Sequence, residues 1–382
     1  LHLPDSLERS QDSVSFGDQD WRDIYTDATL RSLIERALDH NKDMLIAAAR
    51  VKEMAAQKRI STAALLPDIK GKVTGERELE NHGGDAFKRS DTFEAQFLVS
   101  WEVDLWGNLR WARSASIAEY LQSIEAQRAL QMTIVAEVAQ AYYELVALDT
   151  ELDIVKQTLK AREEGVRLAR IRFAGGLTSE TSYRQAQVEL ARTATLVPDL
   201  ERKISLKEND IAYLAGEYPN KIARSRLLQE FNSPETLPVG LPSTLLERRP
   251  DIRQAEQKLI AANAKVGVAY TNMFPRLALT GGFGSESTSL SELLKSPYAV
   301  MEGALLTPIF GWGKNRAALK AKKAAYEAEV HSYEKAVLEA FKETRNAIVN
   351  FNKIKEVYAL RANLERSAKS YMDLAQLQYI NG

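Results

Sequence analysis

Few side chains in this sequence have the types and spacing that catalysis or metal binding requires. The chain has no cysteine, which excludes thiolate zinc sites and cysteine nucleophiles. Neighbouring carboxylates such as Glu163 and Glu164 lie on a charged helical stretch and are expected to face water. The four histidines show neither an HExxH motif nor a paired spacing, and they are expected at the surface. They are His2, His40, His82 and His331. We therefore expect no enzyme, metal site or cofactor.

Two glycine-rich stretches have some of the features of phosphate-binding loops. Gly311-Trp-Gly313-Lys314 lacks the first glycine and the Ser or Thr of the GxxxxGK motif, so we interpret it as a turn from a strand into a helix. Gly281-Gly-Phe-Gly284 precedes no predicted helix, and its glycines are interpreted as strand residues that leave room at one face of a sheet. Neither stretch is predicted to bind a nucleotide.

The composition is that of a folded, mainly helical chain. In 382 residues, 51 basic side chains balance 52 acidic ones, which gives no electrostatic reason to bind nucleic acid. Only 19 Gly and 11 Pro occur, so long uninterrupted elements are expected. No apolar run reaches the roughly 18 residues of a membrane-spanning helix, whereas the alternating strands of a transmembrane barrel would not raise hydropathy. A helical membrane protein is excluded.

The chain repeats itself. An offset of 206 residues places Trp106-Gly107 on Trp312-Gly313, and an offset of 208 places Pro67 on Pro275. The stretch between the repeats carries three prolines and is expected to be an extended linker. The predicted organisation is an extended N-terminal segment (1–28), a first repeat (29–216), a linker (217–240) and a second repeat (241–382).

Within each repeat, the hydrophobic period changes from helical to alternating and back, which predicts two strands between helices. The strands are predicted at about 68–79 and 92–105, and at about 276–284 and 298–307. A polar loop around Asn81, Gly83 and Gly84 is expected to join the first pair as a hairpin. Alternation predicts one apolar face, with Phe93, Phe97, Val99 and Trp101, and one polar face, with Lys70, Lys72, Glu94, Gln96 and Glu102.

We predict two helices of about 65 residues, each on the order of 100 Å long. They run from Asn108 to Arg172 and from Lys314 to Tyr379. Each is expected to end at a matching turn, Phe173–Gly176 or Tyr379–Gly382. After Gly176 the first repeat returns as a helix to Gly216, whereas the second repeat is expected to lack this last helix. An unpaired helical edge is predicted beside the helix from Lys314.

Such long helices would overshoot a sheet of strands about 35 Å long, so lipid is the better partner for the apolar face. Four strands are too few to close a barrel, and three chains would supply twelve. We therefore expect a trimer whose polar face lines water and whose apolar face contacts outer-membrane lipid. Two alternatives are an α+β protein whose helices cover the sheet, and a non-channel scaffold that pairs its long helices with a partner.

Several motifs in this order resemble the TolC-like outer-membrane efflux channels, in particular the OprM/NodT-like branch that serves multidrug tripartite pumps. The resemblance covers essentially the whole chain, and Arg249-Pro-Asp-Ile252 favours drug efflux over protein secretion. The motifs are Asp20-Trp21, Leu30-Arg-Ser-Leu-Ile-Glu-Arg-Ala-Leu38, Leu65-Leu-Pro67, Trp101-Glu-Val-Asp-Leu-Trp-Gly107, Phe173 to Gly176, Leu241-Pro-Ser-Thr-Leu-Leu-Glu-Arg-Arg-Pro-Asp-Ile252 and Pro308-Ile-Phe-Gly-Trp-Gly313.

The resemblance implies a mainly α fold with a small β part: a homotrimer with a twelve-stranded outer-membrane β-barrel continued by a periplasmic helical barrel. It implies a passive duct that works with a periplasmic adaptor and an inner-membrane, proton-driven RND-type transporter. A lipid-anchoring cysteine is expected before Leu1, and the family's acidic pore ring is expected beyond Gly382. The exported substrate stays open, as do same-fold channels for metal-ion efflux or type I protein secretion.

The helical turns are expected to form the periplasmic tip and to contact the adaptor. Charged groups there could link neighbouring helices, although the simpler alternative for each one is solvation. The residues expected at the tip are Arg170, Arg172, Phe173, Gly175, Gly176, Leu177, Thr178, Glu180, Arg184 and Tyr379.

Overall fold

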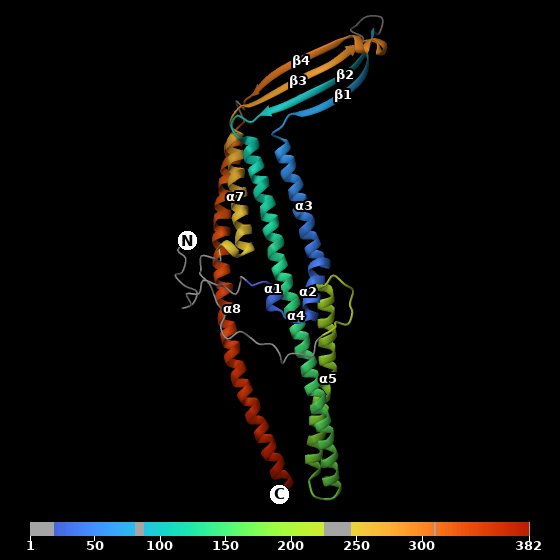
Figure 1. Cartoon of the computed structure of the whole chain (residues 1–382), viewed down its shortest axis with the longest axis vertical. Helices are drawn as coiled ribbons and strands as arrows, with labels where there is room; N and C mark the ends of the chain where they lie inside the picture. The colour runs from blue at the N-terminus through green and yellow to red at the C-terminus, as the bar shows by residue number, and fades with distance from the viewer. Residues whose placement is uncertain (1–18, 81–87, 225–245, 309–310, 382) are drawn as a thin grey trace. The chain divides into compact units, whose positions relative to one another are not determined.

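The computed structural model describes residues 19–80, 88–224, 246–308 and 311–381 (Figure 1). The chain is mainly helical with four strands, as predicted, and these strands form one antiparallel sheet in the order β1-β2-β3-β4. The elements are α1 (Trp21–Ile24), α2 (Ala28–His40), α3 (Lys42–Ala63), β1 (Asp68–Glu80), β2 (Lys88–Val103), α4 (Asn108–Ala174), α5 (Glu180–Leu214), α7 (Pro250–Thr271), β3 (Arg276–Ser287), the 3-10 helix η2 (Leu290–Lys295), β4 (Pro297–Leu306) and α8 (Lys314–Asn381).

The observed elements differ from the predicted ones mainly at their ends. Strand β2 ends at Val103 rather than at residue 105, because the following residues turn into α4. Helix α8 continues through Asn381, so the predicted turn does not begin at Tyr379, and Gly382 lies outside the described residues. The N-terminal segment is not wholly extended, since Asp20 caps the short helix α1. The predicted hairpin loop around Gly83 and the linker beyond Arg224 also lie outside the described residues.

The chain divides into two compact units, and these are not the two repeats. The first unit comprises Leu1–Ala49, Gln127–Arg248 and Phe341–Gly382, and the second comprises Arg50–Ala126 and Arg249–Ala340. Each repeat therefore contributes to both units. The cause is the length of the helices, since α4 and α8 each have residues in both.

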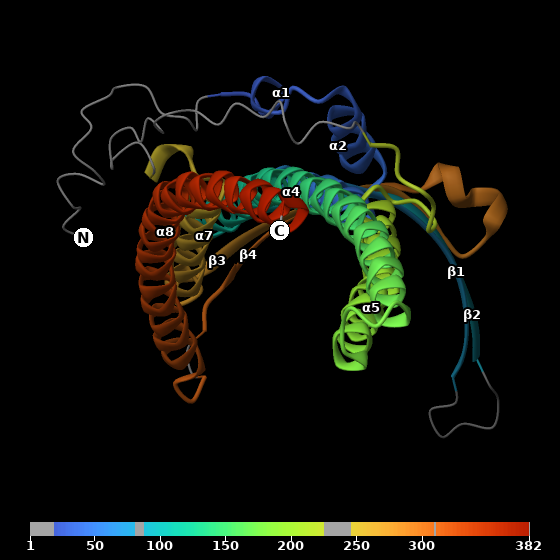
Figure 2. The ribbon, with the colours of Figure 1, turned by 90° about the horizontal axis from the view of Figure 1, so that it is seen from below.

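The core of the first unit is built from α2, α4 and α5. Figure 2 shows the lower part of α4 beside α5, which returns antiparallel to it. Tyr142 of α4 is buried, and its hydroxyl donates to Asp27 Oδ2 at 2.7 Å. The other carboxylate oxygen of Asp27 caps α2 by accepting from the Thr29 N–H at 2.8 Å. The fully buried apolar side chains of this core include Leu30, Leu33, Ile34, Leu145 and Ile211.

The second unit contains the sheet and the helix segments that adjoin it. Buried alanines on α4 and α7 permit close packing of these helices. They are Ala115, Ala118, Ala261, Ala264 and Ala269. None of the helices in the described part of the chain has an apolar stretch long enough to cross a membrane.

A left-handed glycine ends α5 against α2. Gly216 has φ of 73°, its N–H donates to the Tyr213 carbonyl, and the Glu217 N–H donates to the Ala212 carbonyl, which is the Schellman arrangement. A Cβ at this position would lie 2.2 Å from the His40 carbonyl oxygen. Both the conformation and the contact therefore require glycine.

We predict that Gly216→Ala destabilises the first unit by about 2 kcal/mol or more, because a side chain must either adopt positive φ or displace the end of α2. Gly165→Ala is the matched control, since Gly165 lies inside α4 with open space around its Cβ position. The control should raise stability by about 1 kcal/mol through helix propensity. Melting temperatures from circular dichroism in detergent check both, and equal melting temperatures would contradict the assigned packing.

Candidate functional site

The two faces of the sheet differ sharply in chemistry. Residues paired across neighbouring strands share a face, so the register aligns Phe97 with Phe283 and Trp101 with Leu279. On this face Phe97 is 66% exposed, Phe283 64% and Met301 95%. The sequence-predicted apolar residues Phe93, Phe97, Val99 and Trp101 all lie on it. The four strands thus present a continuous, solvent-accessible apolar surface in the isolated chain.

The opposite face carries a polar cluster centred on Glu94. Its carboxylate accepts from Lys72 Nζ at 3.2 Å, Thr74 Oγ1 at 3.0 Å and the Tyr298 hydroxyl at 2.6 Å. The Tyr298 hydroxyl also lies 3.2 Å from Gln96 Oε1. These side chains come from β1, β2 and β4, so the cluster spans the width of the sheet.

Sequence reasoning placed Lys72, Glu94 and Gln96 together but missed Tyr298. Two other members of the predicted polar face lie on it without joining the cluster: Lys70 pairs with Asp68 at 2.8 Å, and Glu102 is half-buried. Tyr298 could have been found only from the register, in which it pairs with Gly284 opposite Gln96.

Glycines in β3 leave the room that the polar face needs. A Cβ on Gly284 would lie 2.6 Å from the Ala95 carbonyl oxygen and 2.7 Å from Gln96 Cβ. A Cβ on Gly282 would touch Leu98, the one apolar side chain that interrupts the alternation of β2, at 3.4 Å. The interpretation of this glycine-rich stretch as strand residues is therefore confirmed.

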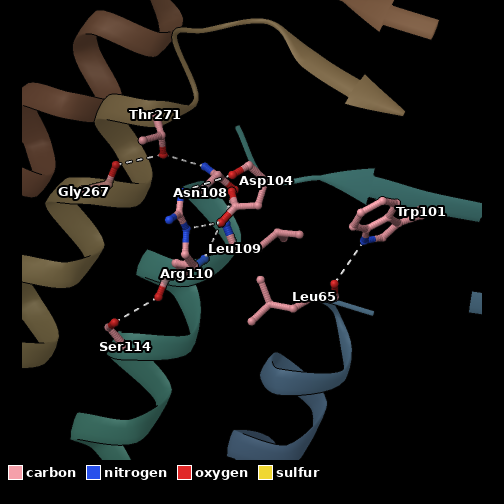
Figure 3. A network of polar contacts seen from close by, with 9 residues as sticks. All are labelled: Leu65, Trp101, Asp104, Asn108, Leu109, Arg110, Ser114, Gly267 and Thr271. Atoms are coloured by element: carbon pink, nitrogen blue, oxygen red, sulfur yellow. Dashed lines mark hydrogen bonds and ion pairs between the residues drawn. The ribbon is translucent and has the colours of Figure 1, made fainter. Parts of the chain in front are cut away.

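A polar network fastens the end of β2 to the start of α4 (Figure 3). Gly107 precedes α4 with φ of 80°, which allows the chain to fold back so that Asp104 reaches the first turn of the helix. The Asp104 carboxylate accepts from the Leu109 N–H and the Arg110 N–H, each at 3.0 Å, and from Arg110 Nε at 3.1 Å. Asp104 therefore satisfies two N–H groups that a helix start leaves without partners.

The ionisation of Asp104 reflects these contacts. Burial is the largest single influence and opposes the charged form, but the N–H groups of Arg110 and Leu109 and the Arg110 guanidinium together outweigh it. The pKa of Asp104 is therefore held below its usual value. The folded protein therefore favours the charged carboxylate form of Asp104 over the protonated form.

Hydrogen bonds also connect the sheet end to the neighbouring helices. Asn108 Nδ2 donates to Thr271 Oγ1 at 2.8 Å, joining α4 to α7. Trp106 Nε1 donates to the Pro275 carbonyl at 2.8 Å, and Trp101 Nε1 donates to the Leu65 carbonyl at 3.0 Å (Figure 3 shows the latter). The second repeat has the same Trp-Gly turn before α8, where Trp312 and Gly313 both have positive φ. The stretch Gly311–Lys314 is thus a turn into a helix, as predicted.

The turn between α4 and α5 is built on glycine and an aromatic stack. Gly176 has φ of 72°, and the Leu177 N–H donates to the Arg172 carbonyl at 2.8 Å. Phe173 stacks on Tyr183 with ring centroids 6.1 Å apart and an interplanar angle of 7°. This stack, which sequence reasoning did not single out, is the side-chain contact that links the two helices next to the turn.

Among the charged groups at this turn, Arg184 has its partners within its own helix, α5. Arg184 pairs with Glu180 of its own helix at 3.1 Å and donates to Gln187, as i,i+4 and i,i+3 spacing dictates. Arg170 and Leu177 are exposed, Arg172 and Thr178 are half-buried, and Gly175 lies in the turn. The side chain of Tyr379 lies outside the described residues.

The described residues contain no group of three or more His, Asp or Glu side chains that could hold a metal ion. His40 and His331 are exposed, as expected, whereas His2 and His82 lie outside the described residues. Glu164 is exposed and pairs with Arg167 on its own helix.

Comparison with known proteins shows where this architecture recurs. Residues 33–217 and 241–382 match a family described as "Outer membrane efflux protein". "Outer membrane protein OprJ" of Pseudomonas aeruginosa is 34% identical over 382 residues, which cover 95% of this chain and 77% of the relative. "Cation efflux system protein CusC" of Escherichia coli is 27% identical over 389 residues, which cover 100% of this chain and 84% of the relative.

A solved structure is similar over the full length. The crystal structure of the Campylobacter jejuni CmeC outer membrane channel superposes with a TM-score of 0.91 at 26% identity, and the match covers 100% of this chain and 84% of that one.

We predict that Asp104→Ala destabilises the protein by about 1 to 2 kcal/mol at neutral pH, because two N–H groups of α4 lose their acceptor. Since the pKa of Asp104 is lower in the folded state, its stabilisation is complete above the unfolded pKa of about 3.9 and is lost as the pH falls through the folded value. The difference in melting temperature between wild type and Asp104→Ala should therefore shrink in acid.

Asp153→Asn, an exposed site on the same helix, is the control and should leave the melting temperature unchanged at every pH. If the difference between wild type and Asp104→Ala stayed constant from pH 7 to pH 3, the carboxylate would not be the group that caps α4.

Proposed function

The chain belongs to the outer membrane efflux protein family, and from that premise we propose that it is the outer-membrane channel of a tripartite efflux pump. In this proposal the channel is a passive exit duct for drugs and other small molecules. An inner-membrane transporter supplies the energy, and a periplasmic adaptor connects the two.

The observation that carries the proposal is the two-faced sheet. Its apolar face, with Phe97 and Phe283 each about two-thirds exposed, suits hydrocarbon, while the face around Glu94 suits a water-filled lumen. Within the part of the chain that the structure describes, the outer strands β1 and β4 each pair with another strand on one side only. Because open edges are not tolerated in lipid, other copies of the chain must pair with them. Three copies would close a barrel of twelve strands.

The helices support the same assembly. Apolar side chains on the part of α8 that belongs to the first unit are exposed in the isolated chain. They include Ile354, Leu360, Leu364, Tyr371 and Leu374. Neighbouring helices of a periplasmic tube would cover this surface. We propose that the tube extends the duct through the periplasm and that its tip, at the turn from Phe173 to Thr178, contacts the adaptor.

Within the polar face, Lys70, Lys72, Glu94, Gln96 and Glu102 are the proposed lumen residues. The salt bridge between Lys72 and Glu94 offsets their charges, so this part of the wall resembles a general aqueous pore more than a charged filter. Such a wall fits a duct that leaves selection to its transporter.

The remaining parts of the proposal concern anchoring, partners and substrate. We propose an acylated cysteine before Leu1, and an RND-type transporter as the inner-membrane partner. One relative is named as a cation efflux protein, so metal-ion efflux is the second candidate, and type I protein secretion is a third.

The three candidate functions are distinguished by expressing the chain with each kind of transporter and adaptor in cells that lack their own channel. Restored resistance to antibiotics, restored resistance to metal cations, or restored protein export identifies the cargo.

We predict that Phe97→Lys strongly reduces the amount of assembled, heat-resistant oligomer in the outer membrane. A charge placed at a lipid-facing midplane position costs about 2 to 4 kcal/mol. Gln96→Lys is the matched control, because the adjacent residue of β2 points to the opposite face. It should assemble normally and change the ion selectivity measured in planar bilayers.

Equal assembly of the two variants would mean that the faces are assigned wrongly. Absence of conductance from correctly assembled wild-type protein would favour the alternative of a non-channel scaffold.

We predict that Gly176→Leu impairs efflux and adaptor cross-linking while the oligomer still assembles. A side chain at φ of 72° costs about 1 to 2 kcal/mol and reshapes the turn, which belongs to the first unit, whereas the sheet belongs to the second. Gly165→Leu, at a helical position with open space, is the control and should leave efflux intact. Normal efflux in Gly176→Leu would remove this turn from the adaptor contact.

A further inference from the structure

An aromatic pocket of about 480 Å³ lies below the sheet, between α4, α7 and α8. All of its lining residues belong to the second unit. Trp106, Trp111 and Tyr270 line it while remaining 50%, 40% and 51% exposed, so the pocket opens to the surface of the chain. Its volume is in the range of pockets that hold a small molecule or part of a lipid.

The wall of the pocket nearest the sheet consists of aromatic rings in contact with one another. Trp106 stacks on Phe274 with centroids 5.1 Å apart, and Phe274 meets Tyr270 edge to face at 5.3 Å. Trp106 follows the end of β2 by three residues, and Phe274 precedes β3 by two. In the proposed membrane setting these rings lie at the periplasmic end of the strands, on the side of the inner leaflet.

A glycine in α7 makes the pocket possible. A Cβ on Gly267 would lie 2.4 Å from Trp111 Cδ2, so the indole of α4 rests directly on the backbone of α7. Glycine inside a helix costs about 1 kcal/mol relative to alanine. The close approach of Trp111 is therefore the reason why this position accommodates glycine and no larger residue.

The pocket is polar at the end away from the sheet. Lys323 lies nine residues into α8, and Asn263 lies eight residues before the end of α7, so each is roughly 12 to 14 Å from the helix end nearest the sheet. Leu319 lies one turn nearer the sheet than Lys323. Among the residues that the structure describes, Lys323 forms no salt bridge and the Asn263 amide makes no hydrogen bond. The Thr271 hydroxyl, by contrast, already has partners: it accepts from Asn108 Nδ2 and donates to the Gly267 carbonyl.

We propose that this pocket binds a phospholipid of the adjoining leaflet, with an acyl chain against Trp106, Trp111 and Phe274 and the phosphate beside Lys323 and Asn263. The direction of the pocket matches that of a lipid in the inner leaflet, whose chains point toward the strands and whose phosphate points toward the periplasm. The charge also matches, since a lysine without an ion-pair partner stands where the phosphate would lie. The inference rests on the proposed placement of the strands in the outer membrane.

The competing occupant is a second copy of the chain. A protein surface that filled the pocket would need an acidic side chain opposite Lys323, and it would exclude lipid from the assembled oligomer. Because residues 1–382 contain no cysteine, a cysteine introduced at the pocket tests this directly.

The experiment measures tryptophan quenching in the assembled full chain, purified in a neutral detergent and titrated with dibrominated phosphatidylglycerol. We expect saturable quenching, part of which is lost in Trp111→Phe. Lys323→Gln should raise the half-saturating lipid concentration about tenfold, as expected for the loss of a charge-assisted contact. Gly267→Val should abolish the saturable part, because the added side chain displaces the Trp111 indole.

Lys320→Gln is the matched control, since this exposed lysine on α8 does not line the pocket. The proposal is overturned if Lys323→Gln and Lys320→Gln give the same titration, or if dibrominated diacylglycerol, which lacks the phosphate, binds as tightly as phosphatidylglycerol. It is also overturned if Lys323→Cys in lipid-free oligomer resists a water-soluble maleimide, because a second copy then covers the site.

Single-channel conductance of the same preparations separates this inference from the proposed function. Normal conductance in Lys323→Gln with unchanged lipid titration removes the lipid site and leaves the channel. Absent conductance in assembled wild type, with intact lipid binding, removes the channel and leaves the site.

Discussion

The unpaired outer edges of the sheet are the constraint on which the rest of the molecule depends. Strands β1 and β4 each have one side without a neighbour, and the face that carries Phe97 and Phe283 is apolar and exposed. In water either feature promotes aggregation, and in lipid each unsatisfied backbone group costs several kcal/mol. Closure with other copies pairs the open edges, and lipid then covers the apolar face. Membrane insertion and oligomerisation are therefore two aspects of one requirement in the proposed channel.

Sequence reasoning located the strands and long helices because their signals are local. Alternation of period two identifies β2 from its own residues, and the scarcity of Gly and Pro is sufficient to predict α4 and α8. It missed Tyr298 in the polar cluster because pairing of β2 with β3 and of β3 with β4 brings that residue to Glu94, and no local pattern encodes such a register. The two predicted repeats and the two compact units divide the chain differently, since each unit draws on both repeats.

The two sheet-to-helix junctions show how the repeats have diverged. Both use a Trp-Gly pair with a left-handed glycine before a long helix. Only the first has an aspartate to cap that helix, since the position 206 residues after Asp104 is Phe310. The chain thus keeps the turn that the backbone requires in both copies, while the side chains that stabilise it differ. At the tip, Arg184 pairs with Glu180 one turn away on its own helix, as i,i+4 geometry favours, and ion pairs to neighbouring helices of the assembled tube stay a prediction.

The hydrogen bond between Tyr298 and Glu94 joins residues 204 positions apart in the chain. Pairing of β2 with β3 spans a comparable separation, so half of the sheet cannot form until most of the polypeptide is available. Contacts between residues so far apart in the sequence form slowly, because the entropy of closing a long loop is lost before any pairing compensates for it. The hairpin of β1 and β2 and the long helices can form earlier. Until β3 is available, the edge of β2 that will pair with it stays open. During that interval this edge is open to pairing with a strand of another chain, which is a route to aggregation.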